Sequence, residues 1–151
     1  MREIKFRAWH KEKKIIGNVL GIDILHKEMF FSNENVNCYE YADFKDIELM
    51  QYTGLKDKNE KEIYEGDILF DRFGEIYYKV IFKNASFRAE FKGDFDEYSF
   101  DLIDVNLQWC EVVGNIHENP ELLGEKKWLQ SGKRIWRELV RSGINENRSI
   151  H

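Results

Sequence analysis

The segment from Met50 to Phe70 reads MQYTGLKDKNEKEIYEGDILF, and its alternation of β-prone and turn-forming residues decides the fold. A β-prone run stops at Gly54, a polar loop follows over residues 56–61, and two short extended runs are joined by a turn at Gly66. Glycine at that turn supplies a backbone freedom that a Cβ would oppose. Bends of this kind lead one strand into the next in small β-barrels, so the segment indicates a fold rather than a reaction.

The remainder of the first 123 residues repeats this pattern of short apolar or alternating runs between turns. Residues 15–25 contain Gly17 and Gly21, which favour a strand with a bulge or bend over a helix. Residues 39–44 are ambiguous, because the segment 43–46 fits either a helical turn or an irregular approach to a strand. The other expected strands are 3–9, 29–31, 47–53, 76–82, 87–91, 98–100 and 109–116.

A different pattern begins near the C-terminus. Asn119 and Pro120 are a helix-start signal, but Gly124 closes that helix after a single turn. From residue 126 the apolar residues recur at helical spacing. They form a stripe made of Trp128, Leu129, Ile135, Trp136, Leu139 and Val140. The sequence therefore predicts a mainly β protein: an antiparallel barrel- or sandwich-like domain over residues 1–123, then a basic tail over 124–151 that forms an amphipathic helix.

Composition and charge place the chain among globular proteins. Its 151 residues suffice for one domain with a core, and 34% of them are charged. The net charge of −5 is uneven: from residue 125 onward seven Lys/Arg face three Asp/Glu, a net +4, which leaves −9 on the first 124 residues. We expect a cytoplasmic protein with two free thiols, Cys38 and Cys110, because no cysteine motif, signal peptide or membrane span is present.

Three groups of residues could carry chemistry, and each has a structural explanation. The run Asp57-x-Asn59-x-Lys61 begins like a calcium loop but lacks the required glycine and final glutamate. His117 and Glu118 follow a strand without a second ligand at metal spacing. The acidic cluster could hold a divalent ion or an acid–base pair, but its members alternate with aromatics as exposed strand positions do. It consists of Asp94, Asp96, Glu97, Asp101 and Asp104. We therefore assign no catalytic residue, no cofactor-binding residue and no metal ligand.

The tail offers a possible surface for nucleic acid or for an acidic partner, because phosphate groups attract clustered cations. The basic residues that we single out for this surface are Lys126, Lys127, Lys133, Arg134, Arg137 and Arg141. In the competing interpretation these cations face solvent while the apolar stripe packs on another subunit or on the chain's own body. We expect self-association, as a dimer, through the stripe.

Several strings, in this order, resemble the YopX family of phage and prophage proteins. They are REIKFRAW at 2–9, MQYTGLKDKN at 50–59, KEIYEGDI at 61–68, VGNI at 113–116 and ENPELL at 118–123. The chain departs from the family at Glu60, where the loop usually has glycine, at His10 and His117, and in the tail beyond Leu123. The resemblance, over residues 1–123, implies a mainly β fold with barrel and sandwich features, a phage or prophage origin and self-association. It implies no known catalytic activity.

Three functional hypotheses remain. The leading one is a non-enzymatic accessory protein that acts as a binding or oligomeric module in the bacterial cytoplasm, without a membrane or an identifiable small-molecule ligand. The alternative is a nucleic-acid-associated protein that uses the basic C-terminal helix. The third is a small metal-dependent or acid–base hydrolase built on the acidic cluster or His117.

Overall fold

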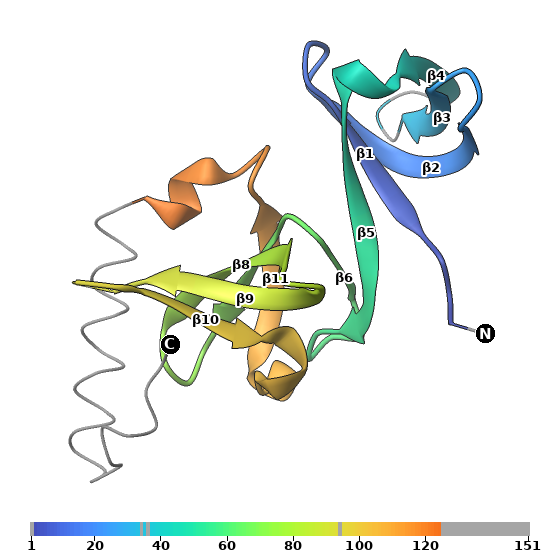
Figure 1. Cartoon of the computed structure of the whole chain (residues 1–151). Helices are drawn as coiled ribbons and strands as arrows, with labels where there is room; N and C mark the ends of the chain where they lie inside the picture. Colours follow the sequence, from blue (N-terminus) through green and yellow to red (C-terminus); the bar gives the residue numbers. More distant parts are fainter. Residues whose placement is uncertain (1, 34, 36, 94, 125–151) are drawn as a thin grey trace, which may run out of the picture. The chain divides into compact units, whose positions relative to one another are not determined.

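The structure is a computed structural model that describes residues 2–33, 35, 37–93 and 95–124. It divides the chain into two compact units, Met1–Gly54 and Leu55–His151 (Figure 1). The boundary that the sequence suggested, at residue 123, lies where the described residues end. The predicted tail helix, its apolar stripe and the six candidate basic residues lie outside the described part of the chain.

The first unit is an antiparallel sheet with strand order β4-β3-β2-β1-β5. Its strands are β1 (Phe6–His10), β2 (Ile15–Asp23), β3 (Glu28–Asn33), β4 (Cys38–Asp43) and β5 (Ile47–Lys56). The expected bend in the 15–25 segment is confirmed by a register shift between Val19 and Gly21. The ambiguous segment contains both alternatives in succession, strand β4 and then a short 3-10 helix, η1 (Phe44–Asp46). The prediction that a strand stops at Gly54 is wrong, because β5 continues to Lys56.

The second unit is built on a five-stranded antiparallel sheet with order β10-β9-β8-β7-β11. Its strands are β6 (Glu62–Tyr64), β7 (Asp67–Asp71), β8 (Ile76–Lys83), β9 (Ser86–Lys92), β10 (Glu97–Asp101) and β11 (Cys110–Asn115). β6 is assigned to the ladder beyond β5. The described part of this unit also contains three 3-10 helices: η2 (Leu102–Asp104), η3 (Leu107–Trp109) and η4 (Pro120–Leu123). The single helical turn expected after Asn119 is thus present as η4.

Of the barrel- or sandwich-like architecture that the sequence predicts, the structure has two antiparallel sheets and no closed barrel in its described residues. Each sheet ends in edge strands, and in the described residues no strand ladder closes either sheet on itself. The mainly β, antiparallel character is as predicted, because the short alternating runs do form strands. Closure depends on strand tilt and stagger, which the alternation of apolar residues does not specify.

Each unit has its own apolar core. In the first unit Ala8, Met29, Phe31 and Ile47 form a buried cluster. The larger cluster of the second unit comes from period-two alternation, as in the first five residues of β8, where every second residue is buried. Its members are Ile63, Leu69, Ile76, Tyr78, Val80, Ala89, Phe91, Leu102 and Cys110. Burying a large apolar side chain contributes about 1.5–3 kcal/mol, so these clusters are the main stabilising element of each unit.

The turn between β6 and β7 has the geometry that its glycine predicted. Gly66 has a φ of +87°, in the left-handed region that a side chain disfavours. Its N–H donates to the carbonyl of Val80 at 2.8 Å, and its carbonyl accepts from the N–H of Ile116 at 2.8 Å. The turn therefore ties β8 and the end of β11 together. Among the described residues, no helix is long and apolar enough to cross a membrane.

Candidate functional site

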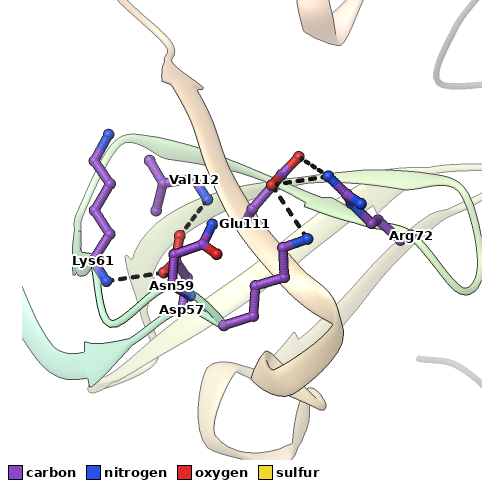
Figure 2. A network of polar contacts seen from close by, with 7 residues as sticks. Asp57, Asn59, Lys61, Arg72, Glu111 and Val112 are labelled. Atoms are coloured by element: carbon purple, nitrogen blue, oxygen red, sulfur yellow. Dashed lines mark hydrogen bonds and ion pairs between the residues drawn. The ribbon is translucent and has the colours of Figure 1, made fainter.

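The loop of residues 57–61, called here the Asp57 loop, is organised by one buried carboxylate (Figure 2). Asp57 is only 3% exposed. Its Oδ1 accepts the backbone N–H groups of Asn59 at 2.8 Å and Lys61 at 2.9 Å. Its Oδ2 accepts the N–H of Val112 in β11 at 2.9 Å. The residue that began the imperfect calcium loop is thus a hydrogen-bond acceptor for the chain's own backbone.

These contacts also cover the outer edge of β11. Beside the carboxylate, the N–H of Lys58 donates to the carbonyl of Cys110 at 3.0 Å. Two backbone groups of an edge strand are therefore satisfied by the Asp57 loop instead of by a further strand. An exposed strand edge otherwise invites pairing with another chain. With both carboxylate oxygens engaged, Asp57 is poorly placed to take a proton from a substrate.

A small ion-pair network lies next to this loop. Glu111 contacts the ammonium of Lys58 at 3.4 Å and the guanidinium of Arg72 at 3.3 Å (Figure 2). Partial desolvation raises the pKa of Glu111, but hydrogen bonds from Arg72 and Lys58 outweigh it and leave that pKa below its usual value. The arrangement joins the Asp57 loop and the end of β7 to β11, so its clearest role is structural.

An exposed aromatic pair lies beside the end of β7 and the start of β11. The rings of Phe73 and Trp109 stack with centroids 4.5 Å apart, although both side chains are exposed. Asp71 holds the turn that carries Phe73, since its Oδ1 accepts the N–H groups of Phe73 at 2.9 Å and Gly74 at 3.2 Å. The Arg72 N–H donates to the Trp109 carbonyl at 3.1 Å. Exposed, pre-positioned aromatic rings are typical of contact surfaces.

The acidic cluster is not brought together as a ligand set. Asp101 pairs with the guanidinium of Arg88 at 2.7 Å, and that guanidinium also donates to Ser99. Glu97 and Asp101 lie on β10 and Asp104 on η2, while Asp94 lies outside the described residues. In residues 2–124, apart from the three undescribed positions, no group of three His, Cys, Asp or Glu residues could hold a metal ion.

His117 and Glu118 belong to a turn that Asn115 organises. The Oδ1 of Asn115 accepts the N–H groups of His117 at 3.0 Å and Glu118 at 2.9 Å. The Asn115 amide in turn donates to the Glu118 carboxylate at 2.8 Å. This geometry explains the position of both residues between β11 and η4 by local backbone needs.

The two cysteines are free thiols in different surroundings. Cys38 is exposed on β4, and Cys110 is buried in the core of the second unit. Burial, followed by the negative charges of Asp71 and Asp57, raises the pKa of the Cys110 thiol to about 12. Cys110 is therefore a protonated core residue at neutral pH and not a nucleophile.

The role of Asp57 was not predicted from the sequence, although a local signal existed. An aspartate whose carboxylate bonds to the backbone two residues on is a common turn former, and Asp57-Lys58-Asn59 fits that pattern. The bond to Val112 had no such signal, because it joins residues 55 positions apart. Residues 125–151, which carry the predicted basic surface, are not described by the structure.

Comparisons with known proteins find one family model and similar solved structures. The family model described as YopX protein matches residues 5–124. Protein EF1440 from Enterococcus faecalis is similar in structure, with 30% sequence identity, a TM-score of 0.49, and coverage of 82% of this chain and 99% of that one. Protein yopX from Bacillus subtilis has 19% identity and a TM-score of 0.54, again covering 82% of this chain and 99% of its own. No curated protein matches the chain.

Proposed function

Because the chain belongs to the YopX family through residues 5–124, we propose that it is a non-enzymatic accessory protein that works by binding a partner or further copies of itself. We place it, as the family resemblance implies, among phage or prophage proteins that act in the bacterial cytoplasm. In this proposal the β units supply surfaces, and the tail supplies a second contact region.

The observation that carries the proposal is the commitment of polar side chains to the chain's own backbone. Asp57, Asp71 and Asn115 each use one side-chain oxygen to accept two nearby backbone N–H groups. Asp101 is engaged by Arg88. Catalytic acids and bases need a free position facing a substrate. Side chains that are already used in this way support a scaffold better than a reaction centre.

Aromatic side chains at the surface give the proposal its second support. Phe73 and Trp109 in the second unit, and Tyr39 and Tyr41 in the first, are all exposed. Tyrosine, tryptophan and phenylalanine are enriched where proteins bind one another, because they bury a large area at a small cost in side-chain entropy. Both units thus offer residues of the type that dominates protein–protein contacts.

The test is a measurement of assembly in solution and in cells. Light scattering of the full chain should give a mass above that of one chain, and truncation after Gly124 should lower it if the apolar stripe of the tail mediates the contact. Cross-linking in host cells should capture a defined complex. A full chain that stays monomeric at all accessible concentrations and gives no cross-linked complex would refute the proposal.

The second candidate function, association with nucleic acid, rests on the +4 charge of residues 125–151. A gel shift that weakens steeply with salt would support it, since displacement of counterions from phosphates produces that dependence. Replacing Arg134, Arg137 and Arg141 by Gln should then reduce affinity for all sequences alike. A shift that survives these substitutions, or that does not depend on salt, would contradict this function.

A further inference from the structure

Strand edges in this fold are unequally covered. The Asp57 loop forms hydrogen bonds with two backbone groups at the edge of β11, the N–H of Val112 and the carbonyl of Cys110. On β10, the guanidinium of Arg88 donates to the carbonyl of Ser99 at 3.2 Å, and the acidic side chains of Glu97 and Asp101 flank that position. Charged side chains and covering loops are the usual means by which proteins prevent unwanted pairing at an edge. The outer edge of β4 differs from the edges of β10 and β11.

The backbone groups of β4 that face away from the sheet can be identified from the register. β4 pairs with β3 so that Phe30 lies opposite Tyr41, and the same register continues to Phe44, whose N–H donates to the carbonyl of Lys27 at 2.9 Å. In an antiparallel ladder the hydrogen-bonded pairs alternate. The even-numbered residues of β4 therefore bond to β3, and the N–H and C=O groups of Tyr39 and Tyr41 point outward.

β4 carries two acidic residues, Glu40 and Asp43, but no bulge, lysine or proline that would block its edge. All six of its residues pair with β3 without a register shift, so no bulge twists the strand away. Its sequence, CYEYAD, contains no lysine and no proline. Tyr39 is 66% exposed and Tyr41 is 71% exposed. Within the described residues, no hydrogen bond is made by the outward backbone groups of these two tyrosines. A straight, uncovered edge of this length can accept another strand.

The side chains above this edge form a pre-positioned aromatic platform. Tyr41 stacks on Phe30 with ring centroids 5.6 Å apart. Phe30 in turn lies over Gly21, where a Cβ would overlap the ring. The register places these three residues opposite one another across β2, β3 and β4. Packing on the bare backbone of Gly21 thus holds the rings in place before any partner arrives.

A row of carboxylates lies on the same face, two residues along the strands. Asp23 is opposite Glu28, and Glu28 is opposite Asp43. Asp23 contacts His26 at 2.7 Å and Asp43 contacts Lys45 at 4.0 Å. For the middle carboxylate, Glu28, no cation among the described residues lies within ion-pair distance. Like charges directly opposite each other on a sheet destabilise it, so a cation added beside this row would be favourable.

We propose that β4 is a docking edge for an extended, basic segment of a partner protein, which adds as a further strand and sets Lys or Arg against Asp43. The inference rests on the proposed binding function and names its surface and the chemistry of its partner. Two residues along from this Lys or Arg, the partner segment places an apolar or aromatic side chain against Tyr41. Main-chain hydrogen bonds to Tyr39 and Tyr41 supply affinity, and the alternate side chains supply specificity.

Charge complementarity favours such a segment over a second copy of β4. The strand contains Glu40 and Asp43 and no base, so two β4 strands would bring like charges together. Glu40 is moreover already paired with Lys13, at 3.0 Å, on the opposite face. A basic strand instead meets the acidic row with opposite charge, which raises the association rate and disfavours acidic competitors.

The test uses the full chain as bait for a displayed library of random eight-residue peptides. The enriched peptides should carry Lys or Arg two residues from an apolar or aromatic residue. A synthetic version of the best one should bind about tenfold or more weakly to Tyr41→Pro, which removes an outward N–H, and to Asp43→Lys, which reverses the charge. Glu121→Lys makes the same charge change in η4 and should leave binding unchanged.

Circular dichroism and melting temperature show whether each variant folds. If Tyr41→Pro does not fold, the loss of peptide binding by Asp43→Lys still tests the proposal. Failure to enrich any such peptide, or equal binding by wild type and the folded variants, overturns the proposal. A dimer that Tyr41→Pro converts to a monomer, and that no peptide competes with, would make a second copy the occupant. That outcome overturns the basic-segment proposal and leaves the proposed binding function standing.

Discussion

Replacing Asp57 by alanine removes the acceptor that holds the 57–61 loop on β11. Three backbone N–H groups then lose their partner, those of Asn59, Lys61 and Val112. Asn59 and Lys61 are exposed, so water can replace the carboxylate there. Val112 is half-buried, so water replaces the carboxylate less readily at its N–H. The perturbation thus removes one hydrogen bond that is hard to replace and two that are easier to replace.

The expected loss of stability follows from these environments. A hydrogen bond to a charged group contributes about 1.5–3 kcal/mol when its loss leaves a buried partner unsatisfied, and an exposed one contributes a few tenths. Asp57→Ala should therefore destabilise the protein by about 2–4 kcal/mol. Asp57→Asn keeps one acceptor oxygen, which can serve either the loop or β11, and should cost about half as much.

Denaturant unfolding of the full chain measures this difference, and amide hydrogen exchange locates it. The Val112 amide should exchange faster in Asp57→Ala, because its acceptor is gone. Asn59→Ala is the matched control: Asn59 contributes only its backbone N–H to Asp57, so its replacement should change stability by less than about 0.5 kcal/mol. An Asp57→Ala midpoint equal to wild type, together with an unchanged Val112 exchange rate, would show that the carboxylate does not secure the loop.

Four other positions carry predictions that substitutions, a thiol reagent or a pH series can check. Glu60 has a φ of +63°, so Glu60→Gly should stabilise the protein by about 0.5–1 kcal/mol, whereas Glu60→Ala should not. Gly66→Val should destabilise it by about 1–3 kcal/mol, and an unchanged melting temperature would contradict the need for glycine at φ +87°. Iodoacetamide at neutral pH should alkylate Cys38 and spare the buried Cys110 until the chain unfolds. Because the folded Cys110 pKa is raised from 9.0 to about 12, its contribution to stability is complete below pH 9.0 and is lost as pH rises towards 12.

The strands were predictable where alternation was strong, and the arrangement of the sheets was not. In β8, Ile76, Tyr78 and Val80 alternate with half-exposed residues, and the sequence located this strand to within a residue. The division at Gly54 has no comparable signal. β5 passes through that position as one strand, so a local pattern cannot show that the chain contributes to two units there.

The candidate surfaces were missed for a related reason. Tyr39 and Tyr41 stand in a short run that is compatible with a strand or a helical turn. Their importance depends on β4 being the last strand of its sheet, which is a property of strand order. Similarly, Phe73 and Trp109 are 36 positions apart in the sequence, and only the pairing of β7 with β11 brings them together.

Several polar side chains of the described units serve the turns of the fold. At each turn the backbone N–H groups leave the ladder and need another acceptor. Asp57, Asp71 and Asn115 meet this need in the same way, with one side-chain oxygen shared by two nearby N–H groups. Residues that resemble acids for catalysis are therefore used to shape turns. The backbone groups at the β4 edge and the aromatic rings at the surface remain available for contact with a partner, and both are features through which proteins bind other chains.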